Sequence, residues 1–100
     1  MILYNITYCI EKDIEAPWLQ WIRNIYTADV QNTNLVFEHR LLKLLTELDN
    51  DGATYSFQCW FKSMEDCEYY QKFFFDNIQY KHYQQFKGKF VEFGTLLETV

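Results

Sequence analysis

Apolar and polar side chains alternate along the start of the chain. Over Ile2–Ile10, one set of alternate positions holds only isoleucine and tyrosine, and the other set holds Leu3, Asn5, Thr7 and Cys9. A period of two predicts a β-strand with one core face and one mixed face. The same alternation over Lys89–Val100 predicts another strand at the end of the sequence.

The middle of the chain predicts a β-hairpin. The apolar runs Leu35–Leu48 and Ala53–Phe61 flank the tetrad Asp49-Asn50-Asp51-Gly52. Asp-Gly after Asn favours a tight turn, because glycine tolerates a positive φ and Asp or Asn side chains bond the nearby backbone. We therefore expect two antiparallel strands on either side of this turn.

The segment between the first strand and the hairpin predicts an amphipathic helix. Pro17 suits the first turn of a helix, where its missing N–H is not needed. Apolar residues then recur at spacings of three and four, which is typical of one helical face; they are Trp18, Trp21, Ile22, Ile25 and Ala28. We expect the helix to end at the polar connector Gln31–Asn34.

A second helix is predicted after the hairpin. Ser63 can cap the first amides of a helix, and Glu65 and Asp66 suit its positive end. The apolar stripe that follows is Cys67, Tyr70, Phe74 and Ile78, widened by Phe73 and Phe75. We expect a kink or break at Asn77–Gln79, a second helical piece over Tyr80–Phe86, and a stop at Gly88.

The predicted order β-α-β-β-α-β indicates an α+β fold of the ferredoxin-like type, forming a single domain over residues 1–100. Such a fold has a four-stranded antiparallel sheet with both helices on one face. The other face is left bare, and here it would carry Leu3 and Trp60 among polar residues. Because a monomer rarely leaves so apolar a face exposed to water, we expect a second copy packed sheet to sheet, with a cavity between the two sheets.

Net charge narrows the choice of partners. The formal charge of −5 argues against nucleic acid and against an anionic membrane surface, since both attract clustered Lys and Arg. The one basic-leaning patch contains Lys81, His82, Lys87 and Lys89. We interpret it as a solvated helix end and loop, with phosphate binding as the minor alternative.

The cysteines and histidines predict neither a metal nor a cofactor. Cys9, Cys59 and Cys67 are odd in number and lack metal or redox spacing. They are therefore expected to be free thiols, which favours a reducing, cytoplasmic setting. The first residues do not form a signal peptide, and no window is apolar enough to cross a membrane. His39 and His82 lie far apart, and are interpreted as a strand histidine and a surface helix histidine.

Polar side chains on the mixed sheet face are the candidate binding residues, because buried polar groups need partners. With one aromatic neighbour, they are Asn5, Thr7, Arg40, Gln58, Trp60 and Thr95. They could bond one another across a dimer interface, or they could line a pocket for a ligand. Acid–base chemistry by Glu38-His39-Arg40 at the edge of a cavity is a further alternative. Which face Arg40 occupies depends on the hairpin register.

Several stretches resemble a small bacterial family known only as a domain of unknown function. They are the start Met1–Thr7, Trp18-Leu19-Gln20-Trp21, Arg40–Leu45 with Tyr55–Gln58, and the ending Lys89–Glu98. The resemblance implies a ferredoxin-like fold of the dimeric α+β barrel type and no assigned activity. The chain departs from the family pattern at Tyr26 and Ala28, where relatives tend to carry His and Pro, and at Gly94, where they tend to carry Arg.

Two functions follow as hypotheses. The first is a non-enzymatic homodimer that acts as a binding or interaction module through its open sheet face and could enclose a small apolar ligand. The alternative is a dimeric α+β barrel enzyme resembling cofactor-independent monooxygenases or haem-degrading proteins. The alternative rests on fold analogy, and one fold hosts many functions.

Overall fold

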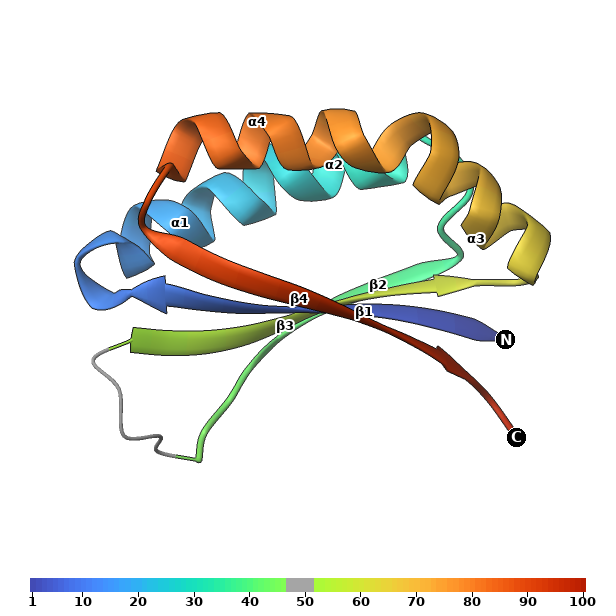
Figure 1. Cartoon of the computed structure of the whole chain (residues 1–100), viewed down its shortest axis with the longest axis horizontal. Helices are drawn as coiled ribbons and strands as arrows, with labels where there is room; N and C mark the ends of the chain where they lie inside the picture. The colour runs from blue at the N-terminus through green and yellow to red at the C-terminus, as the bar shows by residue number, and fades with distance from the viewer. Residues whose placement is uncertain (47–51) are drawn as a thin grey trace.

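The computed structural model describes residues 1–46 and 52–100. Four strands form one antiparallel sheet, and all the helical segments lie on one side of it (Figure 1). The strands are β1 (Ile2–Glu11), β2 (Glu38–Lys43), β3 (Gly52–Phe61) and β4 (Phe90–Glu98). Their order across the sheet is β2-β3-β1-β4, so the predicted ferredoxin-like α+β fold is confirmed.

The first helical segment begins earlier than predicted. A 3₁₀ turn, η1 (Lys12–Ile14), leads into α1 (Glu15–Trp21), a π-helical turn η2 (Ile22–Tyr26) and α2 (Thr27–Gln31). The buried side chains are spaced by four, at Trp18, Ile22, Tyr26 and Val30. The wider π turn keeps this spacing on one face, since an α-helix alone would drift away from it. Ile25 and Ala28, predicted in the buried stripe, are exposed instead.

The second helical segment runs without a break from α3 (Met64–Tyr70) through the π-helical turn η3 (Gln71–Phe75) to α4 (Asp76–Phe86). Its start is as predicted, because the Ser63 hydroxyl accepts a hydrogen bond from the Asp66 amide at 3.1 Å. The predicted break at Asn77–Gln79 and the separate piece Tyr80–Phe86 were wrong, since the irregularity is absorbed by η3. Gly88 follows the helix with a φ of 78°, as expected of a helix stop.

The two hairpin strands differ in how well the apolar runs predicted them, since β3 covers all of Ala53–Phe61 and β2 begins later than its run. β2 begins at Glu38 rather than Leu35 and ends at Lys43, although the Phe37 amide still donates to the Trp60 carbonyl at 2.7 Å. β4 ends at Glu98 rather than Val100. Of the predicted turn tetrad, Asp49, Asn50 and Asp51 lie outside the described residues.

The core fills the space between the sheet and the helices. Its largest fully buried side chains are aromatic, and they come from both layers: Trp18, Tyr26 and Tyr70 from the helical side, and Tyr8, Phe57 and Phe61 from the sheet. The core face predicted for β1 is therefore confirmed. Within residues 1–46 and 52–100, no helix is long and apolar enough to cross a membrane.

Candidate functional site

The predicted binding residues share the sheet face opposite the helices. Antiparallel pairing places Arg40 beside Gln58, Gln58 beside Asn5, and Asn5 beside Thr95. These four residues form what we call the polar row, which crosses all four strands. Thr7 and Trp60 occupy the adjacent rows on the same face. The structure therefore brings together all six residues that the sequence singled out.

The rows on either side of the polar row mix apolar and polar side chains. One row is Glu38, Trp60, Leu3 and Leu97, and the other is Leu42, Ser56, Thr7 and Phe93. Phe93 is 61% exposed, and Val91 further along β4 is 69% exposed. We call these three rows and Val91 the open face. Its apolar side chains lie mainly on the outer strands β2 and β4.

Hydrogen bonds already connect part of the open face. The Asn5 amide nitrogen donates to the Thr7 hydroxyl at 3.3 Å, and Ser56 donates to the Asn5 carbonyl oxygen. Both bonds join residues of the central strands β1 and β3. The indole N–H of Trp60 is buried and has no partner among the described residues. A buried donor without an acceptor is costly, so this N–H is a candidate contact for a bound group.

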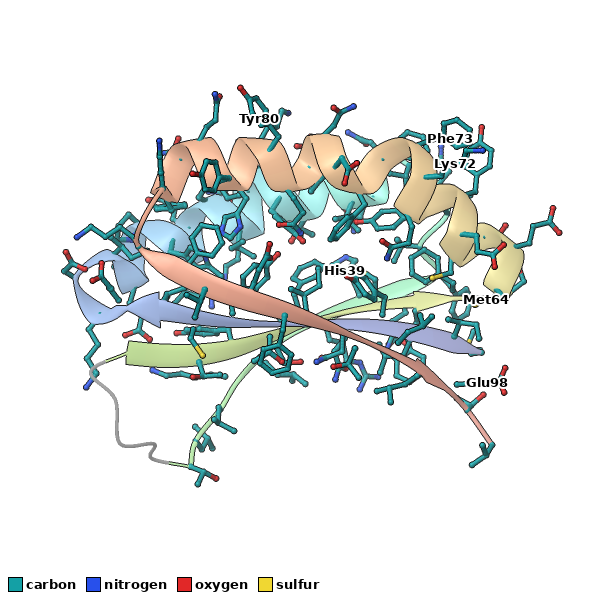
Figure 2. All side chains as sticks on the ribbon, viewed as in Figure 1. His39, Met64, Lys72, Phe73, Tyr80 and Glu98 are labelled. Atoms are coloured by element: carbon teal, nitrogen blue, oxygen red, sulfur yellow. The ribbon has the colours of Figure 1, made fainter. Side chains whose placement is uncertain are left out.

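The three residues considered for acid–base chemistry do not converge. Arg40 and Glu38 share the open face and form an ion pair of 2.9 Å. His39 points to the other side of the sheet, between strands and helices (Figure 2). There its ring stacks on Phe57, and its Nε2 lies 2.9 Å from the side-chain nitrogen of Gln31. The alternating geometry of a strand separates these neighbours in sequence, which removes the proposed acid–base set.

A buried hydroxyl cluster lies on the helical side of the sheet. The side-chain amide of Gln79 donates to the hydroxyls of Tyr8 and Tyr26 at 2.9 and 2.8 Å, and the two hydroxyls are 2.9 Å apart. Burial raises the pKa of both phenols well above the usual value. The phenols therefore stay neutral near pH 7 and serve as hydrogen-bonding groups that join β1 to both helical segments.

His82 lies next to this hydroxyl cluster and corrects a prediction. It was expected on the surface, but it is completely buried. Its Nε2 accepts the indole hydrogen of Trp18 at 2.8 Å, and its ring stacks on Phe90 with centroids 4.1 Å apart. Burial lowers the pKa of His82 to about 4, so the ring is neutral at pH 7.

Sequence reasoning missed this interior cluster of Tyr8, Tyr26, Gln79 and His82. One signal was available, because a tyrosine on a core face needs a partner for its hydroxyl, and Tyr8 was placed on such a face. The inward direction of Tyr26 and His82 depends on the π turns, which the apolar spacing does not reveal.

Two lysines of the predicted basic patch are paired with acidic residues. Lys81 pairs with Asp29 at 3.0 Å, and Lys89 pairs with Asp13 at 3.1 Å and with Glu11 at 3.2 Å. With His82 buried, the predicted basic patch is not a continuous surface. The three cysteines are free, and burial raises the pKa of Cys59 to about 12. No group of His, Cys, Asp and Glu suited to a metal ion occurs in the described part of the chain.

The fold and the bare sheet face define a ferredoxin-like α+β protein. The chain belongs to the family described as "Domain of unknown function (DUF4286)", whose model matches residues 1–100. This agrees with the resemblance noted in the sequence. No curated protein sequence matches the chain.

Solved structures with the same fold differ widely in sequence. A dimeric ferredoxin-like protein from an uncultured marine organism has a TM-score of 0.73 at 13% identity, covering 100% of this chain and 95% of its own. HapK from Hahella chejuensis has a TM-score of 0.73 at 8% identity, with coverage of 100% and 93%. A candidate antibiotic biosynthesis monooxygenase from Nitrosomonas europaea has a TM-score of 0.70 at 8% identity, with coverage of 100% and 99%. At these identities the likeness establishes the fold alone.

Proposed function

We propose that the protein acts as a homodimer whose two open faces pack against each other, and that it is a binding or interaction module rather than an enzyme. The observation that carries this proposal is the bare, partly apolar face of the sheet. In most domains a sheet of this kind is covered by a second layer, because its apolar side chains otherwise remain in water.

The charge distribution supports self-association. The chain has a net charge of −5, and two copies would repel each other through most surfaces. Within the three rows of the open face, however, the only charged residues are Glu38 and Arg40, and these two pair with each other. The open face is therefore the part of the sheet surface on which a second copy meets little repulsion.

Strand β4 adds a second reason for a partner. It lies at the edge of the sheet, and Val91, Phe93 and Leu97 are all exposed along its open-face side. An exposed, apolar edge strand tends to pair with strands of other chains unless it is covered. The dimeric state of the ferredoxin-like protein from the marine organism is in line with such an arrangement.

The polar row supports a binding role for the dimer. Its four polar side chains lie in the middle of the face, with Trp60 in the next row. A few placed polar groups among apolar walls are typical of small-molecule sites. We therefore propose that a small, mainly apolar ligand sits between the sheets at this row. The three free cysteines support a reducing, cytoplasmic location.

Phe93→Asp tests the interface. The new carboxylate would be buried between the sheets without a partner, so we expect the dimer Kd to rise at least about 100-fold. The matched control is Tyr80→Asp, because Tyr80 is also 61% exposed but points away from the sheet on α4 (Figure 2). Native mass spectrometry and light scattering of both variants give the readout. A monomeric wild type, or two variants that dimerise equally, would refute the interface.

The competing hypothesis is an enzyme of the kind found on this fold. An absorption spectrum recorded beside the native mass separates the two. A dimer that carries haem, flavin or another redox-active group would favour the enzyme. A dimer with no added mass, or with an apolar molecule that lacks a visible band, agrees with the binding module.

A further inference from the structure

A second candidate site lies on the helical side of the sheet, away from the open face. It is a groove of about 600 Å³ between the first helical segment and the strands β2 and β3. Lys12, Glu15 and Arg23 line it from the helical side, and Lys43 and Tyr55 line it from the strands. Three cations and one carboxylate therefore meet in one concavity of a chain whose total charge is −5.

The single carboxylate is already satisfied within the groove. The Oε2 atom of Glu15 accepts hydrogen bonds from the Tyr55 hydroxyl and from the Lys43 ammonium, the latter at 2.9 Å. The Tyr55 and Lys43 hydrogen bonds hold the pKa of Glu15 below its usual value. Glu15 and Lys43 thus balance each other's charge, and Tyr55 is fixed between them.

The other two cations have no such partner. Neither Lys12 nor Arg23 forms an ion pair with any of the residues that the structure describes. Among residues 1–46 and 52–100, these two side chains are therefore cations without an ion-pair partner. The planar fork of an arginine guanidinium is well suited to a carboxylate, which can accept two parallel hydrogen bonds from it.

Apolar side chains make up much of the remaining lining, among them Leu19, Leu41 and the ring of Tyr55. Such surfaces give contact to a hydrocarbon body, which an inorganic anion lacks. We propose that this groove binds a small organic carboxylate, with the carboxylate toward Arg23 and the apolar body against Leu19 and Leu41.

Benzoate, followed by NMR of the ¹⁵N-labelled protein, tests this proposal. We expect saturable shifts of the Leu19 and Leu41 amides with benzoate, and at least fivefold weaker binding of the neutral isostere benzamide. Arg23→Gln should weaken benzoate binding about threefold to fivefold, the range of one exposed charge pair. Lys72→Gln is the control, because it removes the same charge on η3, well away from α1 (Figure 2).

Three outcomes would overturn the proposal: equal binding of benzamide and benzoate, unchanged binding by Arg23→Gln, or displacement of benzoate by equal concentrations of inorganic phosphate. The last outcome would indicate a general anion site without recognition of the apolar body. The groove and the open face lie on opposite sides of the sheet, so Phe93→Asp should bind benzoate as the wild type does. Failure of the dimer and failure of this site are therefore distinguishable.

Discussion

At the scale of single residues, His82 shows how burial changes the chemistry of a side chain. Its ring nitrogen Nε2 accepts a hydrogen bond from Trp18, while Nδ1 is buried with no partner among the described residues. Protonation would place a charge in this aromatic surrounding. The folded state therefore binds a proton to His82 only near pH 4, whereas the unfolded chain does so near its ordinary pKa of 6.5.

This difference makes stability depend on pH. As pH falls from 6.5 to 4, the unfolded state gains the proton first, so His82 lowers the free energy of unfolding by about 3 kcal/mol. Above pH 6.5 the effect is absent. His82→Gln keeps an acceptor for Trp18 but cannot titrate. We therefore expect the difference in free energy of unfolding between wild type and His82→Gln to be smaller at pH 4.5 than at pH 7.5. Urea unfolding at both pH values measures this difference.

Tyr80→Gln, an exposed change on the same helix, serves as the control for His82→Gln and should follow the wild-type pH profile. A constant difference between wild type and His82→Gln at both pH values would contradict the burial argument. The sequence alone did not place His82 inside, because a histidine between Lys81 and Tyr83 on a polar helical stretch gives no sign of its direction.

At the scale of elements, one small residue of strand β4, Gly94, leaves room for a side chain of β1 that contacts the helices. A Cβ atom on Gly94 would overlap the Tyr4 hydroxyl and lie 2.8 Å from its Cε1. Tyr4 in turn contacts Phe75 of η3, edge to face, with centroids 5.5 Å apart. Gly94 thus leaves the space that the Tyr4 side chain occupies.

Gly94→Ala should therefore cost about 1–3 kcal/mol of stability, the usual range for overpacking. In a Tyr4→Leu background the same change should cost less than about 1 kcal/mol, because the rigid ring is gone. A double-mutant cycle by urea unfolding measures this coupling. Gly88→Ala is the control, since its cost comes from the positive φ of Gly88 and should not depend on Tyr4. Equal costs of Gly94→Ala in both backgrounds would refute the steric explanation.

Elements with a regular period were predicted well, and irregular ones were not. Alternation assigned Asn5, Thr7, Gln58 and Trp60 to one face, because antiparallel pairing preserves the parity of each strand. The sequence did not decide which face Arg40 occupies, and only the observed pairing of Arg40 with Gln58 places it on the same face. The π turns escaped prediction because they shift a helical face by one residue without any marker such as proline or glycine. The predicted stripe through Ile25 and the predicted break near Asn77 failed for this reason.

At the scale of the whole molecule, we expect Trp60 to stabilise the proposed dimer through the open face. It sits on the face opposite the helices, so it contributes little to the core between sheet and helices. We expect Trp60→Ala to raise the dimer Kd at least about 30-fold, or about 2 kcal/mol. Trp60→Ala should also lower the free energy of unfolding, and by less in the Phe93→Asp background than in the wild type. The reason is that the Phe93→Asp protein is expected to be monomeric, so Trp60 has no contacts with a second copy to lose. Sedimentation equilibrium and urea unfolding supply the two values.

Phe57→Ala is the contrasting variant for Trp60→Ala. Phe57 is fully buried on the helical face, and its truncation should cost about 3–5 kcal/mol of stability whether or not the chain dimerises. A Trp60→Ala protein that stays dimeric and merely unfolds more easily would place the energetic role of Trp60 in the core and contradict the proposed interface.

The two π-helical turns also have an evolutionary consequence. A π turn holds one residue more than the α-helical turn it replaces, so each can be regarded as a tolerated insertion. Removing a residue from Ile22–Tyr26 would rotate the following side chains by about 100° and turn Val30 away from the core. Removing one from Gln71–Phe75 would do the same to Gln79 and His82. Relatives that lack the residue inserted in Gln71–Phe75 should therefore differ from this chain at Gln79 and His82.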